Sequence, residues 1–94
     1  MERKIISSEA LDEALKELSG WRGEAERLKK RWTFPDFASS LAFVNRVGEL
    51  AEAADHHPDI TFGWGYAEIV LTTHDRGGIT DVDMELARQI DRLN

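Results

Sequence analysis

Cysteine is absent from this 94-residue sequence. Its absence excludes disulfide bridges, thiolate metal sites and cysteine nucleophiles, and it is compatible with the cytoplasmic location that we expect. Long hydrophobic runs are missing too, because no apolar stretch approaches the roughly 20 residues that a membrane-spanning helix needs. The opening segment, residues 1–7, has charged residues followed by only two apolar ones, which is not typical of a signal peptide.

An excess of basic residues is also lacking. The sequence has 12 lysines and arginines against 18 aspartates and glutamates, which gives a formal net charge of −6. Proteins that bind nucleic acid through its phosphates need a basic surface, so we expect no direct nucleic-acid partner. The charge balance favours a small molecule or another protein as the partner.

The composition that remains is that of an ordinary globular domain. Hydrophobic residues make up 41% of the sequence and charged residues 32%. We therefore expect one domain over residues 1–94. A chain of this length buries only about 60–65% of its unfolded surface, so its core is thin and oligomerisation is a common remedy.

The first half of the sequence predicts a helix, two strands and a longer helix. Apolar residues recur at helical spacing from Leu11 to Leu18, and they alternate with basic residues in the stretch that ends at Phe34. We expect a first helix capped by Ser7 or Ser8 and ended by Ser19-Gly20, a strand from Trp21 that turns at Gly23-Glu24, a strand over 27–34, and a helix from Asp36 to near Asp55.

The second half repeats this order with two strands and a helix. We expect strands over 60–62 and 66–73 joined by a glycine turn at 63–65, and a last helix opened by a capping box at Thr80–Asp83. The fold class that follows is α+β, in the order α-β-β-α-β-β-α. Its four strands would form one antiparallel sheet with three helices packed on one face.

The three histidines of the sequence all fall between positions 56 and 74. His56 and His57 are adjacent at the predicted end of a helix, and Pro58 prevents that helix from continuing. The hairpin that follows can return His74 to the same place. Imidazole exchanges protons near neutral pH, so this cluster indicates acid–base catalysis at His56, His57 and His74.

Other interpretations of these histidines remain open. An imidazole near a helix C-terminus can simply interact with the helix dipole, and His74 can be a solvated strand end. A zinc site is disfavoured because adjacent histidines diverge and the usual ligand spacings are absent, so we expect no metal. The sequence also has no nucleophile elbow and no phosphate-binding glycine motif.

Three further residues are candidates around this cluster. Glu52 lies one helical turn before His56 and can orient it, although a solvated glutamate is a sufficient explanation. Asp83 is explained by its place in the capping box, with an electrostatic effect on the site as a secondary role. Trp64 lies at a turn, where we expect it to be exposed.

The spacing of these residues is similar to a known signature. Glu52, His56, His57, Pro58, Trp64, His74 and Asp83 occur in the pattern E-x3-HHP-x5-W-x9-H-x8-D. This pattern resembles the pterin-4a-carbinolamine dehydratase family, also known as the dimerisation cofactor of a homeodomain transcription factor. Similar residues also occur around Gly20-Trp21, in residues 34–37 and in residues 71–80, so the resemblance covers nearly the whole chain.

The resemblance implies a function and a set of site residues. The expected reaction is dehydration of 4a-hydroxytetrahydropterin to the quinonoid dihydropterin, without metal or other cofactor, in the recycling of tetrahydropterin for aromatic amino acid hydroxylases. It also implies a homodimer or homotetramer. Besides the three catalytic histidines, the substrate-binding residues implied are Glu52, Pro58, Trp64, Thr73, Asp75, Arg76 and Asp83.

Imidazoles suit this chemistry because the reaction needs an acid for the leaving hydroxyl and a base for a ring N–H proton. We expect His56 or His57 to be the acid and His74 to bind and polarise the substrate. Two alternatives stay open: a protein-binding module that uses an exposed apolar helix face, and a pterin enzyme of altered specificity linked to molybdopterin metabolism.

Overall fold

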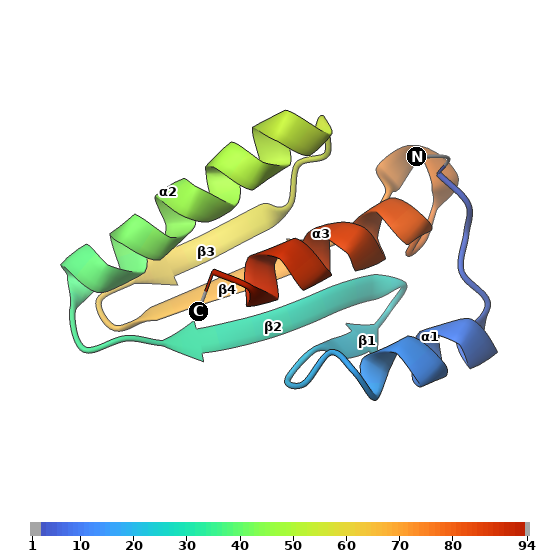
Figure 1. Cartoon of the computed structure of the whole chain (residues 1–94), viewed down its shortest axis with the longest axis horizontal. Helices are drawn as coiled ribbons and strands as arrows, with labels where there is room; N and C mark the ends of the chain where they lie inside the picture. The colour runs from blue at the N-terminus through green and yellow to red at the C-terminus, as the bar shows by residue number, and fades with distance from the viewer. Residues whose placement is uncertain (1–2, 94) are drawn as a thin grey trace.

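Four antiparallel strands and three α-helices make up the computed structural model, which describes residues 3–93 (Figure 1). The sheet order is β1-β2-β4-β3, so the second hairpin inserts its later strand at the centre. The elements in chain order are α1 (Ser8–Leu15), β1 (Arg22–Glu24), β2 (Arg27–Thr33), α2 (Phe37–Ala54), β3 (Asp59–Gly63), β4 (Tyr66–Leu71), the 3-10 helix η1 (His74–Arg76) and α3 (Asp81–Asp91). The α+β fold class predicted from the sequence is confirmed.

The core lies between the sheet and the helices. Alternating residues of the two central strands point to the helices and pair across them, with Leu28 opposite Leu71 and Trp32 opposite Ala67. All four are buried, and Leu28 is fully inaccessible. The half-buried strand predicted over residues 27–34 is therefore present as β2. Only Phe34, the last residue of the predicted range, lies outside it.

Lys30 interrupts the apolar face of β2 without leaving a buried charge unpaired. Its ammonium group donates to Asp91 Oδ1 at 2.9 Å and to the Ser19 carbonyl at 2.8 Å. The Trp21 indole N–H donates to the same Asp91 oxygen at 2.9 Å. This cluster joins the end of α3 to the sheet, so the lysine has a structural partner that local sequence cannot reveal.

The turn between β1 and β2 lies later than predicted. The expected turn at Gly23-Glu24 is wrong, since both residues belong to β1 and the reversal falls at Ala25 and Glu26, with φ angles of 50° and 64°. Gly23 is needed for a different reason. A Cβ there would lie 3.0 Å from the Leu11 side chain of α1, so the absent side chain lets the helix pack closely on the strand.

The second hairpin turns at Trp64-Gly65, within the expected range, with Gly65 at φ +84°. Its strands differ from the prediction at their ends. β3 is one residue longer at each end than the expected 60–62, and β4 stops at Leu71 rather than at residue 73. Thr73 leaves the sheet because its N–H bonds the Gly78 carbonyl at 3.0 Å, which closes the loop that carries η1.

Both ends of α2 follow from local chemistry. Asp36 caps the helix by accepting from the Ser39 N–H at 2.8 Å, as predicted. Hydrogen bonds from the side chain and backbone of Ser39 lower the pKa of Asp36, so the cap is present at neutral pH and is lost only in acid. At the other end Asp55 adopts φ 50°, which stops the helix and redirects the chain.

The segment before α1 pairs with the start of α3, a contact that the sequence did not predict. The Lys4 N–H donates to Asp81 Oδ1 at 3.0 Å, and the Asp81 N–H donates back to the Lys4 carbonyl at 3.2 Å. The Ile6 N–H adds a bond to the Ile79 carbonyl at 2.9 Å. Among the described residues, no helix has the length and apolar character needed to cross a bilayer.

Replacing the most buried residue of β2 tests this core. We expect Leu28→Ala to lower the free energy of unfolding by about 2–5 kcal/mol, because it removes buried methyl groups and leaves a cavity. The exposed neighbour supplies the control, since Arg27→Ala should change it by no more than about 0.5 kcal/mol. Urea denaturation measures both, and equal losses would contradict the assignment of the buried face.

Candidate active site

The three histidines line one cavity. It has a volume of about 280 Å³ and lies where the end of α2, the end of β4 and the segment before α1 meet. The convergence predicted from the sequence is thus present in the structure. The residues that line the cavity are Arg3, Asp55, His56, His57, Thr72, Thr73, His74 and Asp75.

Backbone geometry places these rings. The left-handed conformation of Asp55 turns the chain out of α2, and of the two histidines that follow, His56 is buried and His57 is exposed. The His56 N–H still bonds the Ala51 carbonyl at 3.1 Å, which holds this exit against the last helical turn. His74 begins η1 after Thr72 and Thr73, which follow the end of β4, and Gly77 at φ +71° closes that short helix.

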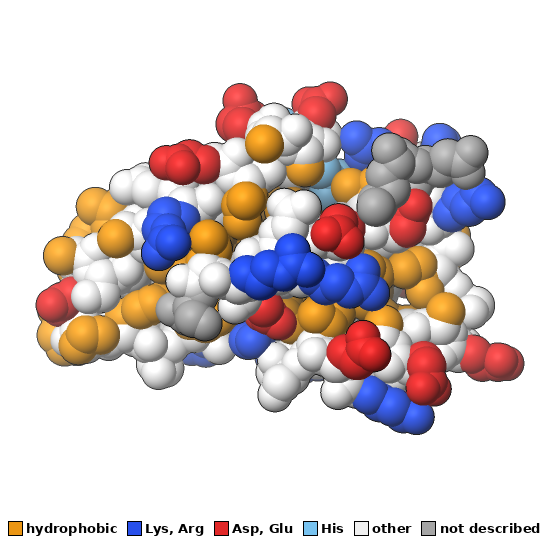
Figure 2. Space-filling model, in the orientation of Figure 1, with side chains coloured by type: hydrophobic (Ala, Val, Ile, Leu, Met, Phe, Trp, Pro, Cys, Tyr) orange, Lys and Arg blue, Asp and Glu red, His pale blue; other side chains and the backbone are white. Residues whose placement is uncertain are grey.

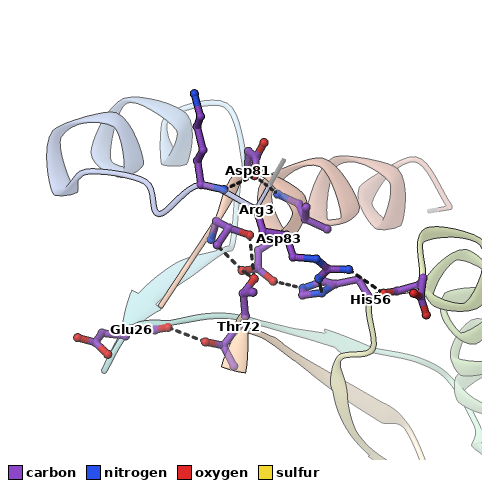
Figure 3. A network of polar contacts seen from close by, with 11 residues as sticks. Arg3, Glu26, His56, Thr72, Asp81 and Asp83 are labelled. Carbon is purple, nitrogen blue, oxygen red and sulfur yellow. Dashed lines mark hydrogen bonds and ion pairs between the residues drawn. The ribbon is translucent and has the colours of Figure 1, made fainter. Parts of the chain in front are cut away.

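His56 is the buried histidine of the pair, with 6% of its surface exposed. Its Nε2 lies 2.5 Å from Asp83 Oδ1, at the start of α3. Its Nδ1 lies 3.0 Å from the guanidinium of Arg3 (Figure 3). Both ring nitrogens therefore have partners within the protein, and neither is left for a substrate in this arrangement.

Asp83 is fully buried and accepts three hydrogen bonds. Oδ1 faces His56, while Oδ2 accepts from the Thr73 hydroxyl and the Thr80 N–H, both at 2.9 Å. The predicted capping box is confirmed, since Thr80 and Asp83 satisfy each other's backbone N–H groups. One carboxylate thus caps α3 with one oxygen and fixes a cavity-lining imidazole with the other.

Thr73 lines the cavity but directs its hydroxyl into the protein. Besides its bond to Asp83, the hydroxyl lies 2.8 Å from that of Thr80, and Thr73 is only 1% exposed. Since Thr73 donates to the carboxylate, Thr80 is the donor between the two hydroxyls. Thr73 thus supports the buried network, and its predicted contact with substrate stays a prediction.

His57 is exposed, and its Nε2 contacts the Glu52 carboxylate. The two side chains are 58% and 77% exposed, so this pair contributes little to stability. Glu52 is a solvated residue of α2, which was the simpler of its two sequence interpretations. The other interpretation, that it orients His56, is wrong because α2 ends at Ala54 and His56 no longer shares a helical face with Glu52. Glu52 orients the second histidine instead.

His74 and Asp75 complete the open side of the cavity. Both are exposed, and the His74 ring makes no hydrogen bond to any residue between 3 and 93. An imidazole in this position is available to a ligand. Within the same residues, no three histidine, aspartate or glutamate side chains are grouped as a metal site would require.

Five predicted substrate-binding residues lie outside the cavity lining: Glu52 and Asp83, described above, and Pro58, Trp64 and Arg76. Trp64 is 72% exposed, as expected, but it lies at the far end of the β3–β4 hairpin (Figure 1). Pro58 lies between His57 and the start of β3. Arg76 donates from Nε to the Arg3 carbonyl at 3.1 Å and so supports the segment that covers the site. Their roles toward substrate remain predictions.

Arg3 is a cavity-lining residue that the sequence gave no reason to expect. Its guanidinium contacts a histidine 53 positions later in the chain, and no local pattern predicts such a contact. Asp55 and Thr72 were also missed as lining residues. Each is adjacent to a recognised site residue, and that adjacency was the available signal.

Comparison with known proteins identifies the family. A family model described as pterin 4 alpha carbinolamine dehydratase matches residues 4–93. The chain belongs to this family. Among curated relatives of this dehydratase family, proteins of Thermosynechococcus vestitus and Rubrobacter xylanophilus are 44% and 46% identical, with 94% of this chain covered in each case. The match covers 93% and 83% of those proteins, and both are named "Putative pterin-4-alpha-carbinolamine dehydratase".

Solved structures of the dehydratase fold agree. A transcriptional coactivator/pterin dehydratase from Brucella melitensis has a TM-score of 0.91 and 27% identity, covering 96% of this chain and 98% of its own. A pterin dehydratase-like protein identified as a RuBisCO assembly factor in the alpha-carboxysome has a TM-score of 0.64 and 28% identity. That match covers 78% of this chain and 84% of the other.

Neutralising the buried carboxylate tests the network around it. In Asp83→Asn an amide N–H₂ must face groups that donate to the carboxylate, so we expect a loss of about 2–4 kcal/mol in the free energy of unfolding. Asp75→Asn, at the exposed rim of the same cavity, should change it by about 0.5 kcal/mol or less. Urea denaturation measures the free energy of unfolding of both variants. Equal values would show that Asp83 does not accept the three buried hydrogen bonds.

Proposed function

We propose that this protein dehydrates 4a-hydroxytetrahydropterin to quinonoid dihydropterin by histidine acid–base catalysis. The observation that carries the proposal is the convergence of His56, His57 and His74 on one cavity in a member of this family. The reaction would recycle tetrahydropterin in the cytoplasm for an aromatic amino acid hydroxylase. It would need no cofactor besides the pterin itself.

The reaction requires two proton movements. A carbinolamine carries a hydroxyl group and a nitrogen on the same carbon, so the nitrogen lone pair expels the hydroxyl once an acid has protonated it. Water leaves, and a base removes a proton from a ring N–H to give the neutral quinonoid product. The pterin ring supplies the electron pair throughout, and no oxidant or reductant takes part.

The surroundings of each ring support a division of roles. His56 has both nitrogens engaged, so we assign it to holding the cavity wall. His57 is exposed and oriented by Glu52, and we assign it as the acid for the leaving hydroxyl. His74 has no partner among residues 3–93 and is available to bind and polarise the substrate. Positioned groups of this kind contribute typically about 10²–10⁴-fold in rate.

Removing the two exposed imidazoles tests the function. His57→Ala and His74→Ala should each lower the turnover number by about 10²–10⁴-fold without unfolding the protein, because both side chains are exposed. The assay is stopped-flow measurement with freshly generated 4a-hydroxytetrahydropterin, after subtraction of the spontaneous reaction. Arg46→Ala, on the exposed side of α2, serves as the control. Undiminished turnover in both histidine variants would overturn the proposal.

The same assay addresses the alternative of altered specificity. If the purified protein leaves 4a-hydroxytetrahydrobiopterin at the spontaneous rate but turns over a pterin with a different C6 substituent, the enzyme class stands and the substrate changes. A link to molybdopterin metabolism would then be the better interpretation. The cavity by itself favours neither substituent.

A surface remote from the histidines supports self-association as a homodimer or homotetramer. Large apolar side chains are exposed where α2 begins and at the β3–β4 turn, with Phe37 44%, Leu41 38% and Trp64 72% accessible. The Ser40 hydroxyl donates to the Gly63 carbonyl at 2.6 Å, which holds these two elements together. Figure 2 shows apolar side chains gathered at this end of the molecule. Exposed apolar clusters commonly mark protein interfaces.

We expect the purified protein to sediment as a dimer or tetramer, and Leu41→Glu to shift it toward the monomer by placing a charge in the contact. Ala10→Glu, an equal change on the exposed face of α1, should leave the assembly intact. Sedimentation velocity measures both variants. A monomeric wild-type protein would show that this surface does not bind a second copy and would favour another protein as its partner.

A further inference from the structure

A second hollow lies beside the histidine cavity and shares one wall with it. It is a groove of about 240 Å³ between the end of α2 and α3, lined by Arg3, Ala54, Val82, Glu85, Leu86 and Gln89. Arg3 also lines the histidine cavity, and Ala54 directly precedes Asp55, another residue of that cavity. The two hollows therefore meet at the Arg3 side chain.

The groove combines apolar surface with a few polar groups. Val82 and Leu86 are buried side chains of α3. Gln89, one helical turn after Glu85, adds an amide group that can both donate and accept hydrogen bonds. The Glu85 carboxylate lies 3.6 Å from Arg88 of the same helix, which offsets part of its negative charge. Small-molecule sites commonly have this composition.

The Arg3 guanidinium is the cationic group of this junction. Its Nη1 contacts His56 Nδ1 at 3.0 Å, and its Nη2 donates to the Asp55 carbonyl at 3.0 Å (Figure 3). A guanidinium has more N–H donors than these two contacts use. Within residues 3–93, Arg3 forms no ion pair with a carboxylate. An anion at the junction would therefore find both a positive charge and N–H donors.

The histidine cavity alone is small for a substituted pterin. Its volume of about 280 Å³ is just below the range of about 300–1,000 Å³ that is usual for ligand pockets. The adjoining groove adds a comparable volume. A pterin ring bound between His57 and His74 would fill the cavity, so its C6 substituent needs further space, and the groove supplies such space next to a cation.

We propose that the groove between α2 and α3 is a subsite for the C6 substituent of the pterin, and that Arg3 selects a substituent with an anionic end, either a carboxylate or a phosphate. This inference rests on the proposed dehydratase function and names the substrate class of the same site. The apolar side chains of α3 contact the carbon chain of the substituent. Glu85 opposes the anion and limits its affinity.

The experiment is a fluorescence titration with two matched pairs of pterins, which needs no turnover. 6-Carboxypterin and 6-hydroxymethylpterin are similar in size and differ in charge. Neopterin phosphate and neopterin differ in the same way on a longer chain. We expect the anionic member of at least one pair to bind about 10-fold more tightly, because charged groups strengthen hydrogen bonds. The pair that shows this preference distinguishes a carboxylate from a phosphate.

Two variants change the charge of the groove in opposite directions. Arg3→Met should reduce the preference for the anionic ligand to about twofold or less, and Glu85→Gln should increase it by about threefold. The neutral ligand of each pair is the internal control, since its Kd reports any disturbance of His56 by the loss of Arg3. Arg46→Met, on the exposed side of α2, should keep the wild-type preference.

Filling the groove tests where the substituent lies. Ala54→Trp places a bulky side chain at an exposed position of the groove lining. We expect it to abolish the preference for the anionic ligand and to leave unsubstituted pterin at its wild-type affinity. Ala53→Trp is the matched control, because Ala53 is exposed on the same helix and does not line the groove.

The outcomes separate this inference from the proposed function. Equal affinities within both pairs, or a preference that survives in Arg3→Met, would overturn the subsite and leave the dehydratase proposal standing. A wild-type protein that binds none of the five pterins would contradict the proposed function together with this inference. A preference that is lost in Arg3→Met and Ala54→Trp but increased in Glu85→Gln supports the subsite.

Discussion

The buried carboxylate of Asp83 is the constraint on which the site depends. A charge without access to water must be compensated by hydrogen bonds, and three donors do this from the end of α2, the end of β4 and the start of α3. Each of these elements carries or adjoins a cavity-lining residue. The requirement to satisfy one anion therefore sets the relative positions of the groups that line the cavity.

Local chemistry made most of the fold predictable. Ser7 and Asp36 cap their helices as expected, and Thr80 and Asp83 form the expected capping box, because these preferences act within four residues. The failure at Gly23 has the opposite origin. Glycine is required there because α1 packs against the strand. A contact between distant segments cannot be predicted from the neighbouring sequence.

The candidate site was also predictable only in part. The convergence of the histidines could be predicted, because a hairpin returns the chain to its starting point. The pairing of Glu52 could not be predicted, because it depends on the left-handed conformation of Asp55, and the predicted helix end near Asp55 did not indicate the direction in which the chain leaves the helix. The contact of Arg3 could not be predicted for another reason. Its partner, His56, follows 53 positions later in the sequence, and an arginine is usually a solvated residue.

The pairing of the leading segment with α3 has a consequence for biosynthesis. Lys4 and Asp81 bond across a separation of 77 positions, and ribosomes deliver the earlier partner long before the later one. The sheet can begin to assemble once β4 has emerged, whereas the histidine cavity must wait for residues 80–83. A nascent chain therefore has no complete histidine cavity until translation has passed that point, and a ligand of this cavity cannot act as a template for the earlier steps.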